Sequence, residues 1–213
     1  MAESPSLRAA QNDAPSVTRL MSFSDGVFAI AITLLALQLR VPTIRDSHSA
    51  QELWRALADL SSQFFTYGIT FALIGVYWLG HHRAFQHITG HNRRLAELNL
   101  LFLFTVSFLP FPAGLLGRYP QNRTAVIVYA GTLAAVTITS AILWMYAVHA
   151  DLTEPGLSPR LRYYLMVRPL AVAGVFLASI GVAFVSTIAA TRLWLFAFPA
   201  LLLVRLLSRD PEG

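Results

Sequence analysis

The sequence predicts an all-α integral membrane protein with six transmembrane helices, and two observations carry this prediction. Hydrophobic residues make up 55% of the 213 residues and charged residues only 13%, whereas a soluble domain carries about 25% charged residues. The apolar residues are grouped in long blocks such as residues 30–37, without the alternation that marks a barrel strand. The length of the chain is therefore used for membrane spans rather than for a water-covered core.

Six apolar segments are long enough, or nearly so, to cross a hydrocarbon core of roughly 30 Å. In chain order they are Ser22–Leu39, Leu60–Gly80, Leu98–Gly117, Thr124–Val148, Pro169–Ala190 and Leu193–Leu207. Pro110 and Pro112 interrupt the third segment near its end. The fifth and sixth segments are predicted to form a tight hairpin that turns near Thr191 and Arg192.

The chain shows no convincing internal repeat and is predicted to be one domain. Residues 1–18 are polar and are expected to be a disordered cytoplasmic tail, residues 19–208 to form the six-helix transmembrane domain, and residues 209–213 a C-terminal tail. The first apolar block contains a carboxylate and is followed by further spans, so we expect an uncleaved membrane helix rather than a signal peptide. The amphipathic segment 50–60 either extends the second helix beyond the membrane or lies on its outer surface.

The positive charges indicate an orientation. All sixteen basic residues are arginines, and they lie between and beside the apolar blocks rather than along one stripe, which argues against nucleic acid as a partner. If the N-terminus is cytoplasmic, ten arginines fall in inside segments and six in outside segments, counted from the rows. Because cytoplasmic loops are enriched in arginine, the sequence predicts that both termini are cytoplasmic.

Motifs for metal binding and catalysis are not evident. Four of the six histidines lie in residues 81–94, but their spacing matches no compact metal signature, so hydrogen-bonding histidines at a helix end are the preferred interpretation. The sequence contains no cysteine, no HExxH, no phosphate-binding loop and no Ser/His/Asp order, which predicts a protein that is not an enzyme and needs no cofactor. It also lacks a TVGYG filter loop and an arginine-rich voltage sensor.

The first span carries a polar motif at its entry. Asp25 lies within about a turn of the predicted membrane boundary, where a carboxylate is costly and needs a partner or water. Arg19 lies six residues earlier and Ser24 adds a hydroxyl. The simplest interpretation is a helix start at the membrane interface with Ser22 or Ser24 as its cap.

Helical periodicity divides the rest of this span into faces. At about 100° per residue, Ile30, Leu34 and Leu37 fall within an arc of about 60°. The opposite side of the helix carries Asp25, Phe28, Leu35 and Leu39. Between the two sides lies a strip of small residues: Gly26, Ala29, Thr33 and Ala36. Small residues allow close helix contact. The aliphatic stripe is therefore interpreted as facing either copies of the same helix or lipid.

These residues carry a resemblance to a known family. The pattern Arg19-x-x-x-Phe23-Ser24-Asp25, continued by GVFAIAITLLAL, resembles the first-helix signature of the lysosomal and prokaryotic potassium channels called transmembrane protein 175. The segments YWLGHH at 77–82, LNLL at 98–101 and LPFP at 109–112 resemble the corresponding parts of the prokaryotic members. The resemblance covers about residues 19–117.

The resemblance implies a fold and a function. Prokaryotic members are six-helix subunits in homotetramers, where four copies of the first helix line a central pore without a pore loop. Ile30 matches the narrow aliphatic constriction, Leu34 and Leu37 match further pore-facing positions, and Thr33 matches a polar pore position of some members. The implied function is a potassium-permeable cation channel of a bacterial cell membrane, with modest selectivity for potassium over sodium and potassium as the permeant ion.

The resemblance also gives the polar motif a role. Arg19, Phe23, Ser24 and Asp25 match a motif that ties the first helix to its neighbours. The candidate partners of this motif are Trp78, Asn99 and either His81 or His82, and the sequence leaves open which histidine takes part.

Two other functions stay open at this point. A secondary or proton-coupled transporter would have an essential ionisable residue and, commonly, internal repeats with broken helices. A membrane scaffold or membrane enzyme has only the histidine cluster in its favour. Under the channel hypothesis, the expected partners are membrane lipid and other copies of the chain.

Overall fold

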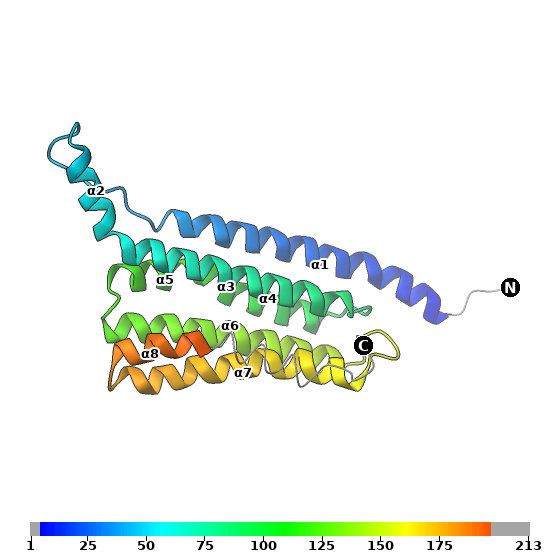
Figure 1. Cartoon of the computed structure of the whole chain (residues 1–213). Coiled ribbons are helices and arrows are strands. Elements are labelled where there is room, and N and C mark those ends of the chain that lie inside the picture. Colours follow the sequence, from blue (N-terminus) through cyan, green and yellow to red (C-terminus); the bar gives the residue numbers. More distant parts are fainter. Residues whose placement is uncertain (1–4, 197–213) are drawn as a thin grey trace, which may run out of the picture.

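The computed structural model describes residues 5–196 of the chain, and the side chains of residues 17–195 (Figure 1). Most of this part is helical. The elements are α1 (Pro5–Ala36), α2 (Ala50–Asp59), α3 (Ser61–Gln86), α4 (Arg93–Phe108), α5 (Pro110–Arg118), α6 (Arg123–His149), α7 (Pro159–Ala183), α8 (Thr187–Leu193) and the short 3-10 helix η1 (Trp194–Phe196).

Five segments of the described residues are long and apolar enough to cross a membrane. They are Val17–Ala36, Ser61–Gln86, Arg93–Arg118, Arg123–His149 and Pro159–Ala183, and the third consists of α4 and α5 together. These five segments correspond to the first five predicted spans. The sixth predicted span, Leu193–Leu207, lies mostly outside the described residues.

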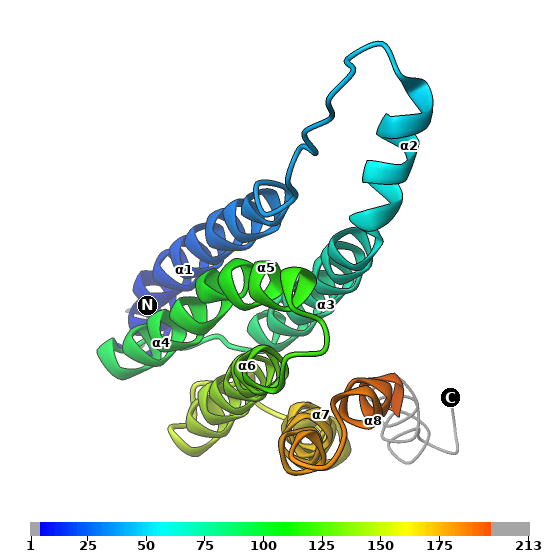
Figure 2. The same cartoon turned by 90° about the vertical axis from the view of Figure 1, so that its left-hand side faces the viewer.

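The long helices run alongside one another, and α1 forms one edge of the bundle (Figures 1 and 2). α1 packs against α3, α4 and α5, whereas α7 packs chiefly against α6. The core between α1, α3, α4 and α6 contains large buried side chains, including Phe28, Ile74, Phe102 and Tyr129. α1 is thus held by one side only.

The N-terminal segment differs from the expectation of a disordered tail. α1 begins at Pro5, so residues 5–18 continue the first helix away from the apolar segment. Leu7, Arg8 and the following alanines and glutamine are strong helix formers. The prediction gave more weight to the prolines and serines of this segment than to those residues.

The fifth helix also differs from its predicted bounds. α7 starts at Pro159 and ends at Ala183, and Pro169 lies inside it. An interior proline is tolerated in a membrane helix because neighbouring groups satisfy the freed backbone carbonyl. The predicted turn near Thr191 is wrong: α8 starts at Thr187, where the Ser186 hydroxyl accepts a hydrogen bond from the Ala189 amide at 3.2 Å.

α2 is a separate helix at the end of the bundle, and it projects beyond α1 and α3 (Figure 1). Ser49 caps it by accepting a hydrogen bond from the Glu52 amide at 3.3 Å. The Glu52 carboxylate reaches back to the preceding loop and accepts bonds from the amides of Arg45 at 2.9 Å and Asp46 at 3.1 Å. These two backbone bonds lower the pKa of Glu52 below its ordinary value.

Replacing Glu52 with glutamine is expected to loosen residues 45–49. Because the folded-state pKa is lowered, the stabilisation is present above the ordinary pKa and is lost as the pH falls through the lowered value. Hydrogen exchange would therefore show reduced protection of the Arg45 and Asp46 amides in the variant at neutral pH, and in the wild type on acidification. Asp59→Asn removes a carboxylate from the same helix and is the control. Equal protection in Glu52→Gln and wild type would contradict this prediction.

Candidate functional site

The inner face of α1 is the one that joins the bundle. Val17, Phe28, Ala31 and Leu35 are buried on it, and Ser24 is the buried polar residue among them. These positions recur every three or four residues, as the packed side of an α-helix does. The 100° periodicity placed Phe28 and Leu35 opposite Ile30, and the structure has the same division.

The outer face of α1 is uncovered by the rest of the chain. Ile30 is 60% exposed, Leu34 38% and Leu37 76%. Gly26, Ala29, Thr33 and Ala36 are also exposed, and a Cβ atom added at Gly26 would meet no other atom within 4 Å. The Thr33 hydroxyl donates to the Ile30 carbonyl at 2.8 Å, so it is turned back towards its own backbone.

A buried polar chain ties the inner face of α1 to two other helices. The amide nitrogen of Asn99 in α4 donates to the Ser24 hydroxyl at 3.0 Å, and Ser24 donates to the Leu20 carbonyl at 2.8 Å. The amide oxygen of Asn99 lies 2.9 Å from His81 Nε2 in α3. An amide oxygen can only accept, so His81 Nε2 carries the hydrogen. All three polar side chains are buried.

The two adjacent histidines have different surroundings. The His81 ring is stacked on Phe85 and Phe102, with ring centroids 4.3 and 5.2 Å away, and Phe28 lies at 5.8 Å. His82 points elsewhere, stacked on Trp78 and 3.2 Å from the side-chain nitrogen of Gln86. His81 is therefore the histidine that lies with Ser24 and Asn99. The aromatic enclosure of His81 was not predicted from the sequence, although the four-residue spacing of His81 and Phe85 places them on one helix face.

The rest of the polar motif lies outside this buried chain. The Trp78 ring nitrogen donates to the Asp25 carboxylate at 2.8 Å, which makes a second link between α1 and α3. Asp25, Arg19 and Phe23 are exposed. The structure thus brings Ser24, Asn99 and His81 together, and Asp25 and Trp78 together, while Arg19 and Phe23 stay on the surface of the single chain.

Replacing Trp78 with phenylalanine is expected to lower the free energy of unfolding by about 0.5–1.5 kcal/mol, because a hydrogen bond to a carboxylate is lost at an exposed position. The aromatic ring stacked on His82 is retained. The measurement is unfolding in detergent of Trp78→Phe, Asp25→Asn and the double variant. If the two single losses simply add, the bond makes no net contribution and this prediction is wrong.

The geometry defines a class of protein. It is a multi-span helical membrane protein whose first helix is fixed on one side by polar bonds and presents a bare aliphatic stripe on the other. A ring of such stripes offers no oxygen ligands, and it acts on ions by excluding water where it is narrow. One chain has a single first helix, so a ring requires several copies.

Comparison with known proteins finds similarity to one family of channels. The model of the family described as "Endosomal/lysosomal potassium channel TMEM175" matches residues 19–110. A potassium channel of Chamaesiphon minutus is 40% identical over 136 residues, and one of Streptomyces collinus is 36% identical over 132 residues. The crystal structure of a lysosomal potassium-selective channel TMEM175 homolog from Chamaesiphon minutus superposes with a TM-score of 0.76 at 29% identity, covering 92% of this chain and all of that one.

The chain resembles the TMEM175 family in its first half and shares the fold of a TMEM175 channel structure over nearly its whole described length. The prediction of an all-α integral membrane protein that resembles this family is confirmed. The sequence alignments cover 62% and 60% of this chain, and 66% and 63% of the Chamaesiphon and Streptomyces relatives, slightly less than two thirds of their length.

Proposed function

We propose that the protein is a potassium-permeable cation channel with modest selectivity for potassium over sodium. The observation that carries this proposal is the exposure of Ile30, Leu34 and Leu37 on one side of α1, opposite the side fixed by Ser24. An apolar stripe at 38–76% exposure in the single chain is suited to lining a narrow passage between copies. The relatives in Chamaesiphon and Streptomyces are named potassium channels, which supports the same function.

The proposed assembly is a homotetramer in which four first helices surround the pore without a pore loop. Ile30 forms the narrowest ring, Leu34 and Leu37 form further rings, and Thr33 lies beside them. Potassium gives up hydration water more easily than sodium, so a narrow, dry ring favours potassium moderately. The first helix is held in register by a set of polar and aromatic side chains: Ser24, Asp25, Trp78, His81 and Asn99. Arg19 and Phe23 lie at the same end of this helix, and His82 of α3 is stacked on Trp78.

The remaining parts of the proposal concern location and chemistry. The protein resides in a bacterial cell membrane with both termini in the cytoplasm, in contact with lipid. It catalyses no reaction and uses no cofactor, and the potassium ion is what it transports.

The test is the reversal potential of purified protein in a planar bilayer under opposing potassium and sodium gradients. The expected result is single-channel current with a reversal potential shifted towards that of potassium. Unitary currents above carrier turnover exclude the secondary or proton-coupled transporter. Saturable flux that requires a coupled proton gradient, without unitary currents, would replace the channel with that transporter. Absence of potassium flux in liposomes would overturn both.

A further inference from the structure

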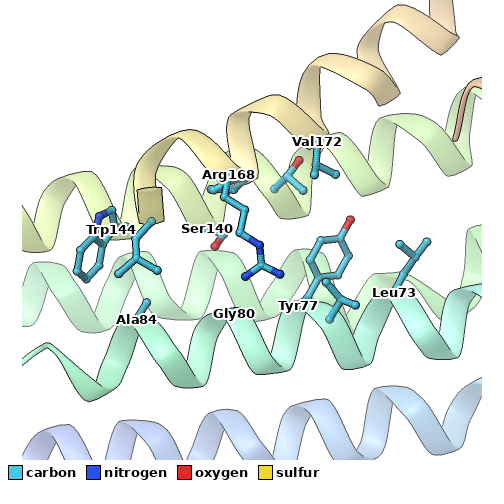
Figure 3. Close-up of a pocket in the computed structure, with 12 residues that line it drawn as sticks. Leu73, Tyr77, Gly80, Ala84, Ser140, Trp144, Arg168 and Val172 are labelled. Atoms are coloured by element: carbon cyan, nitrogen blue, oxygen red, sulfur yellow. The ribbon is translucent and has the colours of Figure 1, made fainter. Parts of the chain in front are cut away.

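A cavity of about 70 Å³ lies between α3, α6 and α7, away from the exposed face of α1 (Figure 3). A cavity needs only about 10–15 Å³ of such space for each water, so this one accommodates several waters or one compact group. Most of its lining surface is apolar. The polar side chains that line it are Tyr77, Thr137, Ser140, Trp144 and Arg168.

Arg168 brings a positive charge into this cavity. Its side chain extends from α7 to α3, where a Cβ atom at Gly80 would lie 3.4 Å from the Arg168 Nη1 atom (Figure 3). In the part of the chain that the structure describes, the ion pairs involve His87, Arg93 and Arg94 but not Arg168. The groups that act electrostatically on Arg168 are Tyr164 first and then Arg83, which carries a charge of the same sign.

This placement is costly for the bundle. α7 is one of the candidate membrane spans, and an arginine within a span normally pairs with an acid, a backbone carbonyl or water. A second arginine nearby adds repulsion rather than compensation. The position therefore calls for an anion.

Two hydroxyl groups in the same cavity suit an anion. The Tyr77 hydroxyl is buried and has no hydrogen-bond partner among the described residues. Ser140 also lines the cavity, and the Arg168 side chain lies between these two residues (Figure 3). The other polar groups are already used: the Trp144 ring nitrogen donates to the Arg162 carbonyl at 3.1 Å, and the Thr137 hydroxyl donates to its own helix. A guanidinium and two hydroxyls, one of them unpartnered, are donors suited to phosphate oxygens.

The position of the cavity in the bundle indicates where the anion comes from. α3 packs chiefly against α1 and α5, and α7 against α6, so the cavity lies where α3 and α7 do not pack directly together. Leu79 and Leu170, next in sequence to the lining residues Gly80 and Pro169, are 57% and 40% exposed. These leucines provide an apolar surface for acyl chains next to a basic, hydroxyl-lined cavity.

We propose that this cavity binds the phosphate of an anionic membrane lipid, with the Arg168 guanidinium as the main ligand and the Tyr77 and Ser140 hydroxyls as further donors. The phosphate enters the cavity, while the acyl chains stay outside against α3 and α7. Basic pockets between membrane helices are a general means of binding such head groups. The site does not depend on ion conduction, so its test is independent of the channel proposal.

The experiment is native mass spectrometry of the purified protein in detergent with added phosphatidylglycerol, together with its thermal unfolding midpoint at rising lipid concentration. Wild type is expected to retain about one lipid per chain and to be stabilised by it. Arg168→Gln is expected to weaken the apparent affinity at least about tenfold, and Tyr77→Phe by a smaller factor. Arg118→Gln removes an exposed charge elsewhere and is expected to behave as wild type.

Two further ligands distinguish a lipid phosphate from free phosphate as the bound anion. Phosphatidylcholine tests the need for net negative charge, and inorganic phosphate tests whether the acyl chains are needed. If inorganic phosphate stabilises the protein as well as the lipid does, the lipid assignment is overturned. If Arg168→Gln binds the lipid as wild type does, the site is overturned and water alone solvates the guanidinium. If Arg168→Gln does not fold, Tyr77→Phe and Arg168→Lys decide, and unchanged affinity in both overturns the proposal.

Discussion

Replacing Asn99 with leucine is expected to lower the free energy of unfolding by about 1–3 kcal/mol. Leucine has the same number and branching of side-chain heavy atoms as asparagine and is the larger of the two, so the loss comes from the hydrogen bonds rather than from a cavity. Asn99 accepts from His81 and donates to Ser24, and all three side chains are buried. The variant leaves the His81 Nε2–H group without its acceptor in an aromatic enclosure. It also removes the link that holds α1 against α3 and α4.

Thermal and denaturant unfolding in detergent measure this loss, and size-exclusion chromatography measures the assembly. Ser107→Ala is the matched control on the same helix, because the Ser107 hydroxyl bonds only to the Phe104 carbonyl of α4. We expect the control to unfold as wild type does and Asn99→Leu to lose both stability and assembled protein. An Asn99→Leu variant as stable as Ser107→Ala would show that the buried polar chain does not hold α1.

The first four spans were predictable because their apolar segments are bounded by polar or proline-containing stretches. The turn between α7 and α8 was not, because Phe184 and Val185 continue the apolar segment although they lie in the turn and are exposed. Its local signal was Ser186, a cap residue within an apolar stretch. The fifth span was predicted to start at Pro169 because a proline usually marks a helix end. In the structure this proline lies inside α7, which starts at Pro159.

The candidate site was predictable where it depends on one helix and not where it depends on the register between helices. Ile30 and Phe28 were assigned to opposite sides of α1 by the 100° rotation per residue alone. His81 and His82 could not be distinguished, because the choice depends on which of them meets Asn99 across α3 and α4. Arg168 was counted only among the orienting charges. Its signal was a charge inside an apolar segment, and its cavity appears only when three helices are placed together.

Replacing Ile30 with asparagine is expected to bring the permeability ratio of potassium to sodium towards one. The aliphatic ring discriminates by requiring ions to lose water, and the asparagine amide supplies polar groups that replace that water for either ion. A fivefold fall in the ratio corresponds to about 1 kcal/mol of lost discrimination. Reversal potentials of wild type and variant under opposing potassium and sodium gradients measure the change.

The control for this substitution must carry the same polar group at a similar exposure on a different helix. Leu177 on α7 is 50% exposed, against 60% for Ile30, so Leu177→Asn matches both the chemistry and the exposure. If both variants lower selectivity equally, the effect is a general one of a polar group in the bundle. If neither does, Ile30 does not line the narrow part of the pore. We expect selectivity to fall in Ile30→Asn and to stay unchanged in Leu177→Asn. The reason is that Ile30 lies on the uncovered face of α1, which is the face of that helix available to the ion.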